Sequence, residues 1–592
     1  MKDFIKYALA TMVGILLFTI VIAIVGSSFM AGVMAVSETT TKVHTPSIFR
    51  LELQGTVNER AADNPFASLM SNEQTELGLD DVLKAIENAT ENENIKGMYV
   101  EAKGISASPA TLVEIHDALL KFRQSGKWIV AYGDTYSQPD YFICSIADKV
   151  ILNPMGAVDW HGLASQTIFF TDLMKKAGVE MQIFKVGTYK SAVEPFFETK
   201  MSDANREQVT SFLNSIWSNM VDAVSLSRNL SPEELNVLAD QHMVTENAET
   251  ILNAGLVDTL LYMDGVKGYL RELMELYDDA SLPTLTLTEV KNISAKKPLD
   301  KSGNIIAIYY AQGGIVQTPS NGNFSGQAEI ASDKVITDLR KLRDDKSVKA
   351  VIFRVNSGGG SAYASEQIWR EVVALKEKKP VIVSMGDMAA SGGYYISCAA
   401  DTIIAQPTTL TGSIGIFGMF PCAEELVNDK LALHFDVVKT NELGDFGTLD
   451  RKMNDREKAK MQKHIEEGYQ TFITRCADGR GMTTEQIDAI GQGRVWTGEQ
   501  ALEIGLVDLL GDLELAEQIA AEKAGIENYS LIAYPEKDSP LALLKDAVKE
   551  DYIDAHVTSA LGQWADDLMF LGNLNTMDHI QARMPYAIHI VD

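Results

Sequence analysis

The sequence predicts an α/β fold built from two tandem copies of one unit, each with a mainly parallel sheet. The first observation is an internal repeat: residues 95–100 match residues 348–353, and residues 130–134 match residues 383–387, both at an offset of 348 − 95 = 253. The second is that apolar runs alternate with amphipathic stretches within each copy, a pattern typical of parallel strands joined by helices. The third is length, because 592 residues are too many for one core.

Each copy is expected to hold the same elements in the same order. In the first copy these are strand 48–53, helix 80–88, strand 97–101, a loop and a helix, strand 128–132, and a helix that ends near Ala147. In the second copy they are strand 305–310, helix 331–343, strand 350–355, a loop and a helix, strand 381–385, and a helix that ends near Ala400.

The same pattern predicts five segments. Residues 1–40 form an N-terminal anchor, residues 41–290 the first repeat, and residues 304–538 the second repeat. Residues 291–303 are polar, with Lys, Pro and Gly, and are predicted to be the linker. Residues 539–592 form a C-terminal tail with a long helical pattern.

The N-terminal segment is the strongest compositional signal. There is no charged residue between Tyr7 and Ser37, whereas Lys2 and Lys6 precede the run. A cleaved signal peptide is the alternative, but its apolar region is normally about 7–15 residues long. We therefore expect residues 7–36 to cross a lipid bilayer once and to remain attached. The positive charges before the span predict a cytoplasmic N-terminus with the body of the protein on the far side.

Composition excludes some functions. With 46% hydrophobic and 22% charged residues the chain is typical of globular proteins, and its net charge of −29 argues against binding to nucleic acid. The four cysteines form no C-x-x-C pair and no histidine flanks them at metal-ligand spacing. We therefore expect neither a disulfide framework nor a metal site, and no cofactor is predicted.

Ser391 is the first candidate functional residue. It lies in residues 385–394 (MGDMAASGGY), between an apolar strand and an apolar helix, and the first copy has Gln138 in its place. Helix N-caps are often serines, and that role is the alternative. Two alanines before Ser391 and two glycines after it favour a nucleophile that another chain must approach closely.

A glycine loop accompanies the serine. Residues 356–361 (NSGGGS) follow the second strand of the C-terminal copy, where the first copy has residues 103–108 (KGISAS). Successive glycines allow backbone N–H groups to approach a ligand and to bind a developing oxyanion. A flexible turn is the alternative.

A serine nucleophile needs a base. None of the nine histidines stands beside a carboxylate at a strand end in a recognisable motif, so a Ser-His-Asp triad is possible but unsupported. Lys190 lies in an otherwise apolar or small run and has Gly444 as its counterpart, whereas both copies keep a lysine at Lys185 and Lys439. Burial would keep such a lysine neutral, as a base must be. A surface salt-bridging lysine is the alternative.

Three segments together resemble the signal peptide peptidase A family, also called protease IV, in its long duplicated form. They are residues 389–394 (AASGGY), residues 356–361 and residues 189–196 (YKSAVEPF), and the resemblance runs from the anchor to the PYA of residues 585–587. It implies that Ser391 is the nucleophile of a serine endopeptidase and that Lys190 is its general base.

The resemblance assigns three further residues. Ser413, in residues 411–415 (TGSIG), matches a serine that orients the lysine, and the backbone N–H groups of Gly359 and Gly392 match the oxyanion hole. The first copy has Asp159 or Trp160 at the place of Ser413. One departure is Gly358, where the family usually has proline, so the free loop is expected to be more mobile.

The family also implies a setting. Its fold is similar to that of the crotonases and the caseinolytic serine protease, with β-β-α units in a spiral, and its long members resemble a tetrameric bowl. Its substrates are remnant signal peptides and other apolar peptides, at the bacterial inner membrane with the catalytic body on the periplasmic side. Two alternatives remain: an acyl-thioester enzyme of the crotonase type, and a non-catalytic oligomeric membrane scaffold.

Overall fold

The structure is a computed structural model that describes residues 40–61, 76–293, 300–319, 328–537, 578–584 and 589–591, together with Gly14 and Phe18. The span predicted over residues 7–36 lies outside these residues except for Gly14 and Phe18, and most of the tail predicted over residues 539–592 lies outside them too. Among the described residues, no helix has the length and apolar character needed to cross a membrane.

The first repeat contains a seven-stranded, fully parallel sheet of order β2-β1-β3-β4-β5-β8, with β9 beside β1. The strands are β1 Ser47–Asn58, β2 Glu76–Gly78, β3 Ile95–Ser106, β4 Trp128–Tyr136, β5 Lys149–Val158, β8 Thr259–Leu260 and β9 Thr284–Leu285. The helices are α3 Leu79–Glu91, α4 Pro109–Gln124, α5 Gln138–Cys144, α6 Thr171–Ala177, α7 Asp203–Arg228, α8 Pro232–Asp240, α9 Ala248–Asn253, α10 Met263–Leu273 and α11 Leu287–Lys291.

The second repeat contains an eight-stranded sheet of order β19-β17-β15-β13-β10-β21, with β16 joining β15 to β20. The strands are β10 Ile305–Gln312, β13 Val348–Ser357, β15 Val381–Ala390, β16 Thr402–Ala405, β17 Leu410–Gly412, β19 Val495–Thr497, β20 Leu509–Leu510 and β21 Ser530–Tyr534. The helices are α12 Ser332–Asp344, α13 Ala362–Lys376, α14 Gly392–Ser397, α15 Asp455–Arg480, α16 Thr484–Ile490, α17 Gly498–Glu503 and α18 Leu513–Ala524.

The two sheets confirm the duplication. The order β10-β13-β15-β16-β20 in the second repeat reproduces the order β1-β3-β4-β5-β8 in the first, and β3 and β13 begin 348 − 95 = 253 residues apart. Every strand and helix predicted within the two repeats is present within a few residues of its expected place. The chief difference is that β15 continues past Met385 to Ala390, because its last residues pair with β17. The strand therefore leads directly into Ser391.

A third sheet joins the repeats. Its order is β12-β11-β14-β22-β18-β7, formed by β12 Glu329–Ala331, β11 Gly314–Val316, β14 Gly359–Ser361, β22 Ile580–Arg583, β18 Phe417–Cys422 and β7 Glu180–Lys185. Strand β7 comes from the first repeat and β22 from the C-terminal tail. Strand β23 (His589–Val591) pairs with β6 (Ala164–Gln166), so the described parts of the tail contact both repeats.

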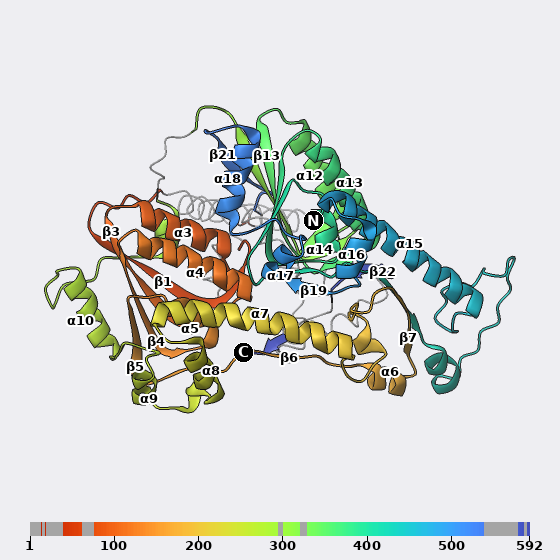
Figure 1. Cartoon of the computed structure of the whole chain (residues 1–592), viewed down its shortest axis with the longest axis horizontal. Coiled ribbons are helices and arrows are strands. Elements are labelled where there is room, and N and C mark those ends of the chain that lie inside the picture. The colour runs from red at the N-terminus through yellow and green to blue at the C-terminus, as the bar shows by residue number, and fades with distance from the viewer. Residues whose placement is uncertain are drawn as a thin grey trace, which may run out of the picture.

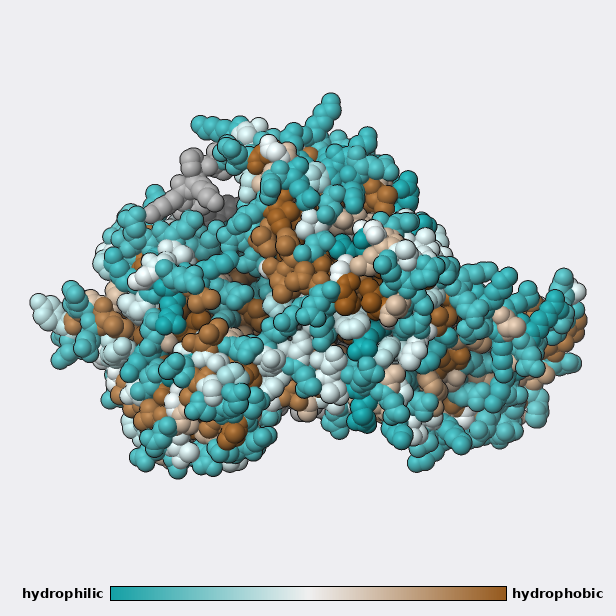
Figure 2. All heavy atoms as spheres, viewed as in Figure 1, coloured by the Kyte–Doolittle hydropathy of each residue, from teal (hydrophilic) through white to brown (hydrophobic). Residues whose placement is uncertain are grey.

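The long helix of the first repeat, α7, also reaches across to the second. In Figure 1 it runs from the first repeat, in red to yellow, to a place below α17 and β19 of the second repeat, in green to blue. The Ser215 hydroxyl lies 2.9 Å from that of Thr497 at the end of β19. Each repeat has its own apolar core, and all four cysteines are buried and free. Figure 2 shows that this face is mostly hydrophilic, with hydrophobic side chains gathered near its middle.

Candidate active site

Ser391 occupies a strained turn between β15 and α14. Its φ of 54° and ψ of −111° lie outside the regions that L-residues ordinarily adopt, which costs on the order of 1–3 kcal/mol. Its N–H donates to the Gly412 carbonyl at 2.8 Å. The side chain makes no capping hydrogen bond to the described helix α14, so the helix-cap alternative is wrong. The turn holds the hydroxyl away from the helix and toward the segment that carries Lys190.

The Lys190 amine lies among three oxygens of the second repeat. Its Nζ is 2.8 Å from Ser391 Oγ and 3.1 Å from both the carbonyl oxygen and the Oγ of Ser413. The structure therefore brings together the three side chains that the sequence predicted, across 201 and 223 residues of chain.

Burial sets the charge of this lysine. Lys190, Ser391 and Ser413 have no exposed surface, so the alternative of a surface salt-bridging lysine is wrong. Burial holds the pKa of Lys190 well below its usual value, since removal from water disfavours the ammonium form. A neutral amine beside a serine hydroxyl can accept its proton.

Lys190 is positioned where its chain segment crosses closely over the segment that contains Gly493. Gly493 has a φ of 79°, and a Cβ added there would lie 2.7 Å from the Cα of Lys190, so only glycine lets the segments cross this closely. The Tyr189 N–H donates to the Gln492 carbonyl at 2.9 Å. From α7, the Gln208 amide donates to the Tyr189 carbonyl at 3.0 Å and to the Ser191 hydroxyl at 2.9 Å. The position of Lys190 thus depends on both repeats.

Ser413 is held in its own constrained turn. Its φ is 49°, and its N–H donates to the Arg494 carbonyl at 2.7 Å. This hydrogen bond attaches Ser413 to residues 492–495, the segment that also contacts the loop carrying Lys190. Its two oxygens can therefore fix the direction of Nζ.

The glycines predicted for the oxyanion hole lie against each other. Gly359 has a φ of 100°, and a Cβ added there would lie 2.7 Å from the Gly392 nitrogen. In this structure the Gly359 N–H donates to Ser357 Oγ at 3.1 Å. The assignment of Gly359 and Gly392 as oxyanion donors stays a prediction.

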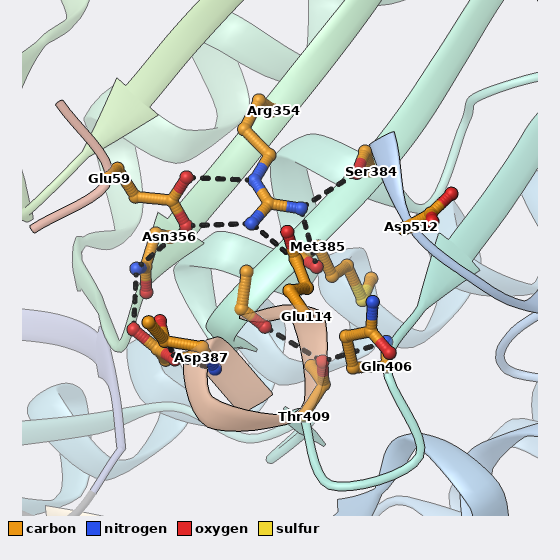
Figure 3. A network of polar contacts seen from close by, with 12 residues as sticks. Glu59, Glu114, Arg354, Asn356, Ser384, Met385, Asp387, Gln406, Thr409 and Asp512 are labelled. Carbon is orange, nitrogen blue, oxygen red and sulfur yellow. Dashed lines mark hydrogen bonds and ion pairs between the residues drawn. The ribbon is translucent and has the colours of Figure 1, made fainter. Parts of the chain in front are cut away.

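A buried network of ion pairs and hydrogen bonds contacts the first residue of the glycine loop (Figure 3). The guanidinium of Arg354, on β13, contacts Glu59 at 2.9 Å and Glu114 at 2.7 Å, both from the first repeat. Burial raises the pKa of Glu114 to about 7, and Arg354 opposes that rise. Asn356, the first residue of the glycine loop, donates to Glu59 at 3.2 Å and to Asp387 at 3.0 Å.

The same network reaches the strand that carries the nucleophile. Asp387 lies on β15, four residues before Ser391, and its carboxylate also accepts from the N–H and hydroxyl of Thr111 at 3.0 and 2.8 Å. Carboxylates and donors of the first repeat therefore fix both the glycine loop and the nucleophile strand of the second.

Sequence reasoning missed these supporting residues. One signal was available: at the repeat offset of 253, Arg354 corresponds to Glu101, a reversal of charge on equivalent strands. Gln208 and Gly493 carry no such signal, because their importance depends on contacts between distant segments.

Two parts of the chain match a known protein family. The chain matches the family described as Peptidase family S49 over residues 121–277, which include Lys190, and over residues 373–527, which include Ser391. Protease 4 of Salmonella typhi is 38% identical over 484 residues, covering 80% of this chain and 76% of that protein. Serine protease SPPA, chloroplastic, of Arabidopsis thaliana is 30% identical over 547 residues, covering 92% of this chain and 78% of that protein.

Among solved structures, a mutant of ClpP1 from Listeria monocytogenes covers 35% of this chain and 93% of its own, with 16% identity and a TM-score of 0.24. The family match covers more than half of the chain in two copies, and the sequence relatives span most of it. The chain therefore belongs to peptidase family S49 and is a serine protease of the protease 4 type.

Proposed function

We propose that the chain is a membrane-anchored endopeptidase that cuts cleaved signal peptides and other apolar peptides with a dyad of Ser391 and Lys190. The observation that carries the dyad is the 2.8 Å contact between Lys190 Nζ and Ser391 Oγ in a site without exposed surface. A hydroxyl becomes a nucleophile when a nearby base can take its proton.

The contacts of Nζ suit the neutral amine. A neutral amine has two N–H groups and one lone pair, and a carbonyl oxygen can only accept. If the two N–H groups donate to the carbonyl and hydroxyl oxygens of Ser413, the lone pair faces the Ser391 hydroxyl. Ser413 is then a positioning residue for the base.

The reaction follows from this geometry. Ser391 Oγ attacks the peptide carbonyl carbon while its proton passes to Lys190 Nζ, and backbone N–H groups at Gly359 and Gly392 stabilise the oxyanion. The C–N bond breaks as Lys190 returns the proton to the leaving amine. Lys190 then takes a proton from water as the water oxygen attacks the acyl carbon. It returns this proton to Ser391 Oγ as the bond between Oγ and the acyl carbon breaks. Losing one oxyanion donor typically costs about 2.7–4 kcal/mol of transition-state stabilisation.

The apolar run of residues 7–36 supports the substrate class and the location. An enzyme held at a bilayer meets the apolar peptides that remain there after preprotein processing. We place the N-terminus in the cytoplasm and the body on the periplasmic side of a bacterial inner membrane, with association into tetramers as in the family that the sequence resembles. Protease protection of the body in sealed inverted membrane vesicles tests the orientation.

A variant set tests the dyad. Ser391→Ala, Lys190→Ala and the double variant are expected to share one low rate on an apolar peptide, because members of a catalytic unit act together. His161→Ala is the control for the triad alternative, since His161 Nδ1 lies 2.7 Å from Asp159 beside Gln138 in the first repeat. Retained activity in Lys190→Ala with loss in His161→Ala would contradict the dyad.

Labelling separates the remaining alternatives. A serine-reactive fluorophosphonate is expected to modify Ser391 in the wild type. An unlabelled Ser391 with turnover of acyl-CoA would instead indicate the acyl-thioester enzyme. If folded protein shows neither labelling of Ser391 nor turnover of acyl-CoA, the non-catalytic scaffold would be indicated.

A further inference from the structure

Strand β22 of the C-terminal tail lies in the middle of a sheet. It pairs antiparallel with β14 on one side, where Gly360 is opposite Ala582, and antiparallel with β18 on the other, where Phe417 is opposite Gln581. Without β22, the edges of β14 and β18 would face each other across a slot the width of one strand. Paired strands lie about 4.8 Å apart, so this slot can take one extended peptide.

Both strands that border this slot lead to residues predicted for the site. Strand β14 begins at Gly359 in the glycine loop, and β18 pairs with β7, after which the chain reaches Lys190. The Ala582 carbonyl oxygen lies against both glycine backbones. A Cβ added to Gly359 would lie 2.1 Å from this oxygen, and one added to Gly392 would lie 2.9 Å from it. The carbonyl therefore lies beside the residues that were predicted to bind an oxyanion.

The pairing register identifies a backbone donor. The Met584 N–H donates to the Gly358 carbonyl at 2.8 Å, and hydrogen-bonded pairs recur every two residues in an antiparallel ladder. The pair of Gly360 and Ala582 is therefore of the hydrogen-bonded type, and the Gly360 N–H faces the Ala582 carbonyl. The donor opposite this carbonyl is Gly360, so the register favours the Gly360 N–H in place of the Gly359 N–H named above as an oxyanion donor.

The side chains of the segment show what the slot accepts. Ala582 and Met584 lie on the same face of an extended chain, where side chains alternate, and at most 3% of either is exposed. Ala582 belongs to the apolar core of the second repeat, and Met584 belongs, with Ala390 and Val495, to the buried apolar cluster that forms the core of the first repeat. The position next to the carbonyl is filled by a methyl group, and the one two residues later by a longer apolar side chain.

We propose that the slot between β14 and β18 binds the peptide substrate. Residues 578–584 occupy this slot as a substrate-like strand, with Ala582 at the position before the scissile bond. This segment must leave the slot before a substrate can enter. The proposal rests on the proposed peptidase function. It names the ligand as an extended peptide, antiparallel to β14, with a small residue before the cut and apolar residues at alternate positions. It also accounts for a nucleophile with no exposed surface.

A reversible cross-link tests the need for release. Ser361 and Gln581 form a directly opposed pair of the type without hydrogen bonds, whose Cα atoms lie about 4.5 Å apart, within the range for a disulfide. The full chain with Ser361→Cys and Gln581→Cys is expected to cut an apolar peptide when reduced, and to fall to the rate of Ser391→Ala when oxidised. Each single-cysteine variant is expected to have the same rate before and after treatment with the same oxidant, whatever its rate relative to the wild type. Equal turnover by the oxidised and reduced forms would overturn the proposal.

A second variant loosens the segment. The Asp578 carboxylate accepts from the Ser361 hydroxyl and, at 2.9 Å, from the Gln317 amide. Asp578→Ala is expected to raise kcat/KM several-fold, mainly through KM, because a larger fraction of molecules has an open slot. A fall in kcat/KM in folded Asp578→Ala would overturn the proposal, since β22 would then be needed to build the site. If Ser391→Ala and Lys190→Ala themselves remain active, it is the proposed dyad that fails.

Discussion

The two repeats fill equivalent positions in opposite ways. At the offset of 253 residues, Ser391 corresponds to Gln138 and Gly415 to Gly162. The Gln138 amide oxygen accepts from the N–H groups of His161 and Gly162, both at 3.0 Å, and its nitrogen donates to the Gly162 carbonyl at 3.0 Å. The side chain is buried, and partners within its own repeat bind both ends of its amide.

The Ser391 side chain is not held in the same way by partners within its own repeat. Its hydroxyl is 3.4 Å from the Gly415 carbonyl, and its shortest contact is the lysine of the other repeat. The first repeat thus keeps a neutral group with local partners. The second keeps a strained backbone and a buried amine, two features that oppose folding. The comparison teaches that only the second site carries the structural costs of a reactive centre.

A second contrast concerns charge. Arg354 is buried between two carboxylates of the first repeat, whereas Glu101, at the equivalent position, pairs with Arg50, whose side chain is 39% exposed. Equivalent strands therefore carry a buried ion network between the two repeats in one case and an ion pair near the surface of the first repeat in the other.

The largest expected effect is the loss of peptidase activity when the lysine found in one repeat alone is replaced. Lys190→Met should reduce kcat/KM by about 10²–10⁴-fold, the usual contribution of a general base. Lys185→Met is the control, because Lys185 is partly exposed in the same segment and its Nζ lies over the ring of Phe197. Steady-state rates on an apolar peptide measure both, and equal losses would mean that the segment, not the amine, matters.

The same variant tests how much the buried amine lowers the free energy of unfolding. Burial lowers the pKa of Lys190 in the folded state, so the unfolded chain binds more protons between that value and 10.5, and stability rises with pH across this window. Lys190→Met removes this slope and should raise the free energy of unfolding at neutral pH. Denaturant unfolding at several pH values measures it, and an unchanged slope would show that the amine is not held neutral.

Breaking the buried network should be the next largest effect. Arg354→Met leaves two buried carboxylates without their cation and should lower the free energy of unfolding by about 3–5 kcal/mol. Arg50→Met removes the equivalent pair of the first repeat and should cost only about 0–1 kcal/mol. Denaturant unfolding compares the two, and similar losses would mean that the network does not distinguish the repeats.

A smaller effect is expected at Gln138. Gln138→Ala leaves the buried N–H groups of His161 and Gly162 without their acceptor and should cost about 1–3 kcal/mol of stability. Peptidase activity below the unfolding transition should not change, because the serine proposed as the nucleophile is in the other repeat. Gln138→Ser combined with Ser391→Ala should remain inactive, since Gly444 is the counterpart of Lys190; recovered activity would contradict the one-sided site.

The smallest expected effect sharpens the comparison with other family members. A Cβ added to Gly358 would meet Met388 and Met584 at 3.9 Å, an ordinary contact, and Gly358 is not among the glycines with positive φ. Gly358→Pro should therefore raise stability by about 0.4–1 kcal/mol. Gly359→Ala, at a φ of 100°, should instead lower it. A destabilising Gly358→Pro would show that the loop needs glycine there.

Much of the fold was predictable from local pattern. The repeat predicted three strands of each copy and their order along the chain, and these are present, but the two sheets contain seven and eight strands. The complementary loss of Ser391 in one copy and Lys190 in the other predicted a site shared between them. These signals lie within short stretches of sequence, so they survive without knowledge of the three-dimensional contacts.

The rest depends on pairing between distant segments. Strand β22 is four residues long, and nothing in Ile580–Arg583 indicates that it lies between β14 and β18. The same holds for Gln208, whose amide bridges two loops, and for Arg354, whose charge is balanced only by residues of the other repeat. Such contacts leave no periodicity in the chain that forms them.

The crossing of the Lys190 loop beneath Gly493 has a consequence for biosynthesis. The ribosome makes the base early, the nucleophile two hundred residues later, and the glycine that lets them meet about a hundred residues after that. A nascent chain therefore holds no assembled dyad for most of its synthesis. If Ser391 and Lys190 form the catalytic dyad as proposed, a chain interrupted before Gly493 is expected to have no peptidase activity, and the order of the sequence delays activity until late in synthesis.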